Sequence, residues 1–169
     1  MDRIKRLRRV GLLCCHFSRN CAYYKAGWVE GKTTASNEFW LTVQNNFLDT
    51  AVLEWLKLFG DFNDKHHWKK VVECPDKFKD QMLYSCGVTE SDLAEQRGSF
   101  KLYRNKFIAH LDSETIMKIP SLDMPLKLTE FYYGYVSKEL GIANRINLPT
   151  ELGDYYKKCF TESKECFGK

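Results

Sequence analysis

Apolar residues recur every three or four positions through most of the chain, and this spacing constrains the fold more than any other feature. In the first segment the recurring residues fall on one stripe of a helix. That stripe consists of Ile4, Leu7, Val10, Cys14, Phe17, Cys21, Tyr24 and Trp28. The alternation typical of strands is almost absent. The pattern therefore predicts an all-α protein.

Residues that start and stop helices divide the rest of the chain. A second helix is expected from Ser36 or Asn37, either of which can cap it, to about Phe59. Further helices are expected over residues 75–86, 89–111, 127–140 and 150–166, whereas 61–70 is polar and typical of a turn. A chain of 169 residues is most simply one domain. We expect a single helical bundle of about five or six helices over residues 1–169.

The net charge of +4 comes from the first nine residues. They hold one acid and five basic side chains, and the remainder of the chain has equal numbers of acidic and basic groups. A basic stretch of this kind can bind the phosphates of RNA, or it can be a solvated helix face. The five basic residues are Arg3, Lys5, Arg6, Arg8 and Arg9.

Seven cysteines, an odd number without CxxC spacing, are typical of reduced thiols in a cytoplasmic protein. The apolar run after the basic start covers about six residues, which is shorter than the core of a signal peptide. No apolar run approaches the roughly 20 residues of a membrane span. We therefore expect a soluble cytoplasmic protein that does not bind membranes.

The most informative string is Tyr-Arg-Asn-Lys-Phe-Ile-Ala-His-Leu-Asp, at residues 103–112. Arg104 suits phosphate because its planar guanidinium is always charged and can bind two oxygens. His110 suits proton transfer because the ordinary pKa of histidine lies near neutrality. Together they have the chemistry to cleave RNA without a metal ion or another cofactor.

Spacing alone leaves the role of these residues open. Six residues of a straight α-helix turn by about 120° and rise about 9 Å, so Arg104 and His110 need not point at one spot. Tyr103, Lys106 and His110 would share a helix face. The alternative is that His110 is favoured at a helix end by the dipole, while Arg104 forms a surface ion pair.

The motif resembles a known family. Arg-Asn, four residues and then His is similar to the Arg-(four to six residues)-His motif of the HEPN superfamily, and the longer string resembles its abortive-infection branch. Asn45-Asn-Phe-Leu-Asp49, Trp55-Leu-Lys-Leu-Phe-Gly60 and His67-Trp68 also resemble that branch. The resemblance covers roughly residues 37–112.

This resemblance implies a helical bundle that dimerises, so that two Arg–His pairs share one cleft. It also implies a metal-independent endoribonuclease, a hydrolase of toxin–antitoxin or phage-defence systems, with RNA, a second copy and a cognate antitoxin as partners. Arg104 and His110 would be catalytic, and Asn105 would support them. From the residues themselves, we expect Asp112 to orient the imidazole, Lys106 to meet phosphate and Tyr103 to support the site.

Two other classes of function stay open. The superfamily contains catalytically silent members that bind RNA, a nucleotide or a protein partner, and a helical bundle can also be a purely structural interaction protein. A metal site is not expected, because the spacing of the candidate ligands matches no tetrahedral pattern. These candidates are Asp61, Asp64, His66, His67 and Cys74, and a packed His-Trp pair is the favoured role of His67.

Overall fold

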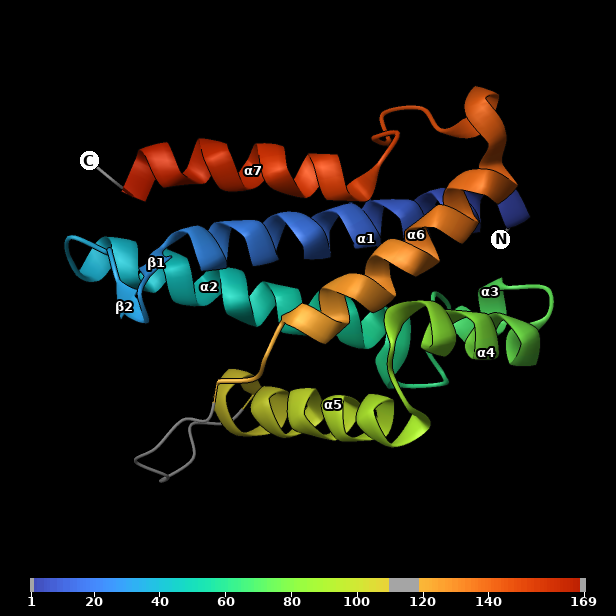
Figure 1. The fold of residues 1–169 in the computed structure, drawn as a ribbon, viewed down its shortest axis with the longest axis horizontal. Coiled ribbons are helices and arrows are strands. Elements are labelled where there is room, and N and C mark those ends of the chain that lie inside the picture. The colour runs from blue at the N-terminus through green and yellow to red at the C-terminus, as the bar shows by residue number, and fades with distance from the viewer. Residues whose placement is uncertain (1, 110–118, 168–169) are drawn as a thin grey trace.

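The computed structural model describes residues 2–109 and 119–167, and these residues form a mostly helical bundle (Figure 1). The predicted all-α class is confirmed, but the described residues contain seven α-helices, more than the five or six expected. They also contain two π-helical segments and a two-stranded hairpin. The elements are α1 (Arg3–Ala26), β1 (Trp28–Val29), β2 (Lys32–Thr33), α2 (Glu38–Trp55), η1 (Leu56–Gly60), α3 (Trp68–Val71), α4 (Pro75–Cys86), α5 (Glu90–Tyr103), η2 (Arg104–Ala109), α6 (Asp123–Asn144) and α7 (Leu152–Phe167).

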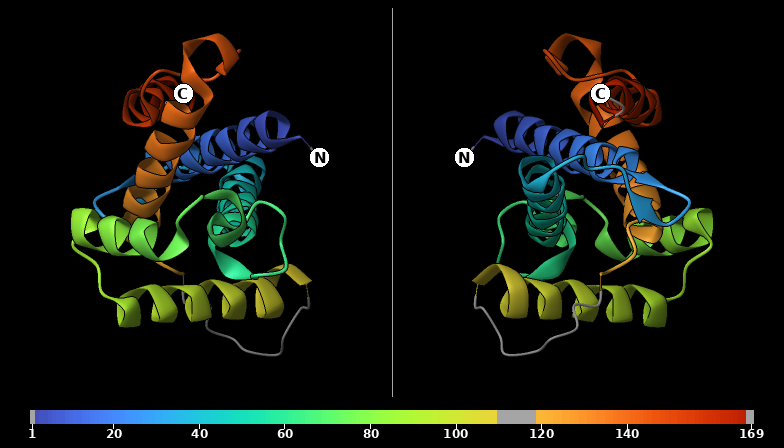
Figure 2. Two further views of the ribbon diagram at one scale, coloured as in Figure 1. Left: turned by 90° about the vertical axis from the view of Figure 1, so that its right-hand side faces the viewer. Right: turned by 90° about the vertical axis from the view of Figure 1, so that its left-hand side faces the viewer.

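The long helix α1 forms the centre of the bundle and packs against α2, α6 and α7. From top to bottom in Figure 1 the order is α7, α1, α2 and α5, while α6 crosses the front, and Figure 2 shows the same order from both ends. Most of the predicted stripe of α1 is buried, from Leu7 to Tyr24. Its two ends differ from the prediction, because Ile4 is exposed and Trp28 lies in β1. The helix ends at Ala26 because Gly27 packs directly on the Gln44 side chain, where a Cβ would lie 2.5 Å from Nε2.

Helix α2 begins as predicted, because the Asn37 side chain accepts a hydrogen bond from the Trp40 amide at 3.1 Å. Its last turn, η1, is π-helical and not α-helical as predicted. Leu56, Leu58, Phe59 and Gly60 of η1 are buried, and Lys57 is exposed. The Phe59 carbonyl, which lies at the end of this helix, accepts from Arg97 Nε at 2.9 Å.

Local signals also set the ends of α4 and α5. Pro75 occupies the first turn of α4, and Gly87 ends that helix in the left-handed conformation at φ 64°. A capping box starts α5: the Thr89 hydroxyl accepts from the Asp92 amide at 3.1 Å, and Asp92 accepts from the Thr89 amide at 2.8 Å. The rings of Trp55 and Phe100 meet at 4.8 Å and join α5 to the core.

The C-terminal helices close the bundle on α1. Helix α6 begins four residues earlier than predicted, at Asp123, and α7 ends close to its predicted position. Two tyrosines of α6, Tyr132 and Tyr133, are buried in the core. The Tyr132 hydroxyl donates to the His66 carbonyl at 3.2 Å, and the Tyr133 hydroxyl donates to the Pro149 carbonyl. No helix among the described residues is long and apolar enough to cross a membrane.

All seven cysteines are free thiols. Cys14 and Cys21 are completely buried on α1, and burial raises the pKa of both thiols well above the usual value. Cys74 and Cys166 are exposed. The absence of any disulfide from this fold agrees with the expectation of reduced cysteines.

His67 makes folding stability depend on pH. The side chain is 2% exposed, and burial, followed by the charge of Arg97, lowers its pKa from 6.5 to about 4. Between these pH values the unfolded chain therefore binds more protons than the folded chain. The stabilisation that comes from a neutral His67 is complete above pH 6.5 and declines as pH falls towards 4. We expect the free energy of unfolding to fall by about 2 kcal/mol between about pH 7 and pH 5 from this group.

Urea unfolding at both pH values tests this, with His67→Asn as the matched variant. Nδ1 of His67 accepts from the Lys69 amide at 3.2 Å and so caps α3, and asparagine keeps a capping acceptor without titrating in this range. The variant should lose about 2 kcal/mol less between the two pH values than the unmodified protein. Equal losses would show that His67 is protonated as easily in the folded state as in the unfolded chain.

Candidate functional site

The Arg–His motif begins where α5 passes into the π-helix η2, at the end of α5 (yellow in Figure 1). The structure places Tyr103, Arg104, Asn105 and Lys106 of the predicted site. His110 and Asp112 lie outside the described residues. The described residues therefore contain the arginine half of the motif.

The π-helix corrects one prediction. Its hydrogen bonds join residue i to residue i+5, so a turn holds more residues than an α-helical turn. Because η2 starts at Arg104, the α-helical spacing that would put Tyr103 and Lys106 on one face does not apply, and His110 lies outside the described residues. Tyr103 is 4% exposed and faces the core, whereas Lys106 is half-buried. Single π-helical turns are rare and are frequent at functional sites.

Tyr103 anchors η2 to α2. Its hydroxyl donates to Asp49 Oδ1 at 2.8 Å, and its ring lies 5.5 Å from the ring of Phe107. Burial raises the pKa of Asp49, and the hydrogen bond from Tyr103 partly opposes that rise. Burial also raises the pKa of Tyr103, so the hydroxyl stays a neutral donor. Tyr103 therefore packs in the core, where its ring and hydroxyl connect the start of η2 to α2.

Arg104 is oriented by two neighbours. Its Nε donates to Asn105 Oδ1 at 3.0 Å, and its Nη1 lies 3.7 Å from Asp61 Oδ2. The side chain is 31% exposed, so the guanidinium reaches solvent with its direction already restricted. The contact with Asn105 agrees with the supporting position that the resemblance implied for it.

Asp61 is shared between two cations. Lys101 Nζ lies 2.9 Å from its Oδ1, closer than Arg104, and this hydrogen bond is the main cause that lowers the pKa of Asp61. An exposed ion pair contributes only about 0–1 kcal/mol, so a phosphate can replace Asp61 as the partner of Arg104. Arg104 thus forms a surface ion pair, as the alternative prediction from the sequence had it, and this ion pair is weak.

Sequence reasoning missed Asp49 and Asp61 as neighbours of the motif. Asp49 is 54 residues from Tyr103, and Asp61 was considered only as a metal ligand. The one available signal for Asp49 was its place at the end of Asn45-Asn-Phe-Leu-Asp49, part of the resemblance. The segments meet because α2 packs against η2 and η1 packs against α5.

The basic N-terminal stretch lies at the other end of the long axis from η2 (Figure 1). Arg3 pairs with Glu139 at 2.7 Å and with Glu73 at 3.0 Å. Arg6 Nη1 donates to the Lys70 carbonyl at 3.3 Å. One copy of the chain therefore does not bring these cations to Arg104.

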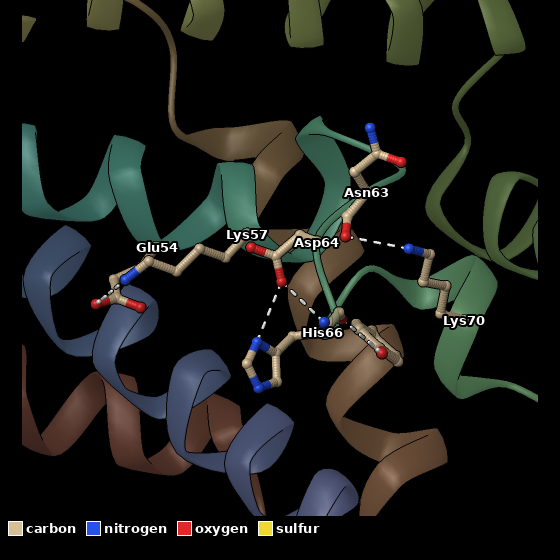
Figure 3. Close-up of polar contacts among 7 residues, drawn as sticks. Glu54, Lys57, Asn63, Asp64, His66 and Lys70 are labelled. Carbon is tan, nitrogen blue, oxygen red and sulfur yellow. Dashed lines mark hydrogen bonds and ion pairs between the residues drawn. The ribbon is translucent and has the colours of Figure 1, made fainter. Parts of the chain in front are cut away.

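The segment considered as a metal site holds a polar cluster of a different kind (Figure 3). His66 Nδ1 lies 3.1 Å from Asp64 Oδ1, and the same oxygen accepts from the His66 amide at 2.8 Å. His67 stacks on Trp68 with ring centres 5.6 Å apart, so the predicted packed His-Trp pair is confirmed. Within residues 2–109 and 119–167, no three His, Cys, Asp or Glu side chains come together in a way that could hold a metal ion.

No protein-family model, no curated protein and no solved structure matches the chain. The resemblance described from the sequence therefore rests on the motif residues alone. The arginine half of that motif adds a restrained, partly exposed guanidinium beside Asn105.

Proposed function

We propose that this chain is a metal-independent endoribonuclease of the HEPN superfamily, acting on RNA in the cytoplasm within a toxin–antitoxin or phage-defence system. The observation that carries the proposal is the state of Arg104. It sits in a π-helical turn, its Nε is held by Asn105, and its guanidinium remains partly exposed. A cation restrained in this way can stabilise charge that develops on a phosphate without reorganising first.

The proposed reaction needs only protein groups and the RNA. His110 takes the proton of a ribose 2′-hydroxyl, the 2′-oxygen attacks the adjacent phosphorus, and the bond from phosphorus to the 5′-oxygen breaks. A protonated imidazole gives its proton to that 5′-oxygen, and the products are a 2′,3′-cyclic phosphate and a 5′-hydroxyl. Arg104 stabilises the added negative charge of the phosphorane-like transition state.

A second copy of the chain would supply the second imidazole. Two Arg–His pairs in one cleft allow one histidine to act as the base and the other as the acid. Leu102 is 55% exposed and lies two positions before Arg104, so one exposed apolar side chain is available beside the motif. We propose a homodimer through this end of α5, with an interface on the order of 1,600 Å² in total.

One observation favours a second candidate, a catalytically silent HEPN module that binds RNA, a nucleotide or a protein such as an antitoxin. The carboxylate of Asp61 lies beside the guanidinium of Arg104 and repels a phosphate that approaches it. A module that only binds a protein partner can keep the ion pair between Asp61 and Arg104 intact.

RNA cleavage in the presence of EDTA separates these candidates. We expect the purified protein to cleave a labelled single-stranded RNA at an unchanged rate when EDTA is added, because no step needs a metal ion. The fragments should carry 2′,3′-cyclic phosphate ends, which can be read by mass spectrometry. Loss of activity in EDTA would contradict the metal-independent mechanism. An intact RNA at every protein concentration, with binding retained, would instead support the silent module.

A further inference from the structure

A cavity of about 180 Å³ lies between the first two turns of α1 and the short helix α3. Three of its lining residues are basic, and Lys70 is more than sixty residues from Arg3 and Arg6 in the sequence. The cavity is remote from Arg104, because the N-terminal end of α1 and η2 lie at opposite ends of the molecule (Figure 1). Its lining residues are Arg3, Arg6, Leu7, Lys70 and Val71.

Two of the three cations lack a carboxylate partner among the described residues. Arg6 donates only to the Lys70 carbonyl, at 3.3 Å, and its Nε is buried without a hydrogen-bond partner in the described part of the chain. Lys70 Nζ donates to the Asn63 carbonyl at 3.1 Å, a contact drawn in Figure 3. An unpartnered buried N–H is costly, so the fold favours a ligand that brings an acceptor to Arg6.

We propose that this cavity binds a phosphate group of an RNA backbone through Arg6 and Lys70. The ligand class rests on the proposed action on RNA, whereas the site itself does not depend on cleavage. An arginine fork gives a phosphate two parallel hydrogen bonds, and a lysine adds a point charge. The volume is about six times the share of one water in the liquid, which is enough for a phosphate group with some of its water.

The surroundings of Arg3, the third cation, favour a single RNA strand over an anionic membrane as the ligand. Arg3 is paired with Glu73 and Glu139, which set two negative charges at the rim of the cavity. These carboxylates would repel a sheet of anionic lipid headgroups. A flexible strand can place one phosphate in the recess and turn its neighbours away from the rim. Bases would then lie outside, so binding would be insensitive to sequence.

The test measures binding of a fluorescein-labelled 2′-O-methyl RNA, which lacks the attacking hydroxyl and cannot be cleaved by the proposed route. Anisotropy titrations at several salt concentrations give the slope of log Kobs against log salt. The double substitution Arg6→Gln with Lys70→Gln should weaken binding about tenfold and reduce the slope by about 0.7, the value for one phosphate on a single strand.

The matched control is Lys5→Gln with Arg8→Gln. It removes the same amount of charge, from positions of α1 outside the lining of the cavity, and should change affinity no more than about threefold through long-range attraction. Lys70→Gln alone guards against misfolding, because Arg6 contacts the backbone carbonyl of Lys70 and not its side chain. Lys70→Gln alone should lower log affinity by at least half as much as the double substitution of Arg6 and Lys70.

Three outcomes would overturn the site. The two double variants could lose the same affinity, which would show that Arg6 and Lys70 act only through the overall charge of the protein. The Arg6 and Lys70 variants could bind as the unmodified protein does. Alternatively, they could lose binding to vesicles of phosphatidylserine and phosphatidylcholine while keeping RNA, which would assign the surface to lipid. Failure of cleavage by the unmodified protein bears on the nuclease proposal alone, because the probe cannot be cleaved.

Discussion

Replacing His110 by alanine should lower the rate of RNA cleavage by a factor of about 10² or more, the usual effect of losing a general acid or base. The loss should appear in kcat, because proton transfer occurs in the transition state, and RNA affinity should change little. Single-turnover cleavage of a labelled RNA measures the chemical step directly. In the unmodified protein kcat/KM should follow a bell-shaped dependence on pH, since one imidazole must be neutral and another protonated.

His16→Ala is the matched control for this experiment. His16 is a half-buried histidine of α1, so its removal tests the cost of losing an imidazole away from η2. The control should cleave RNA at a rate close to that of the unmodified protein. If His110→Ala cleaves as fast as His16→Ala, proton transfer by His110 is excluded.

Replacing Arg104 by alanine should lower kcat by about 10² to 10³, the usual effect of removing one preorganised donor to a developing negative charge. Arg104→Lys should recover only part of this loss. An ammonium cannot keep the Nε contact with Asn105 and still present a second donor to the phosphate. Ground-state binding of the uncleavable RNA should weaken far less than kcat falls.

Lys101→Gln is the matched control, because Lys101 also pairs with Asp61 and lies one helical turn before Arg104. It removes one cation from the same surface and should leave kcat within a few-fold of the unmodified value. A fall in affinity without a fall in kcat in Arg104→Ala would make Arg104 a binding residue. That result would support the silent module in place of the nuclease.

Short-range signals predicted the ends of helices well. Asn37 caps α2, Pro75 opens α4, Gly87 closes it, and Thr89 forms the capping box of α5. Each of these signals acts through the backbone of residues within one turn, so it can be read from a short string. The helical periodicity likewise predicted the all-α class, because burial of one stripe is a property of the segment itself.

Features that depend on distant contacts were not predictable. The bond from Arg97 to the Phe59 carbonyl in η1, for example, joins residues that are 38 positions apart. Helix α3 was expected to be a turn, and it is a single helical turn capped by the buried His67. The contact between Tyr103 and Asp49 likewise forms only when α5 docks on α2. The candidate site was therefore predictable as a string of residues but not as a geometry.

The rate at which the buried thiols of α1 react with a reagent reports how often the helical bundle opens. Cys14 and Cys21 face neighbours on three sides, because α1 packs against α2, α6 and α7, so a reagent reaches them only when the bundle separates. Their raised pKa values slow the reaction further, since the thiolate is the reactive form. Cys74 and Cys166 are exposed and react from the closed state. The ratio of slow to fast modification therefore follows how often the bundle opens, without any engineered label.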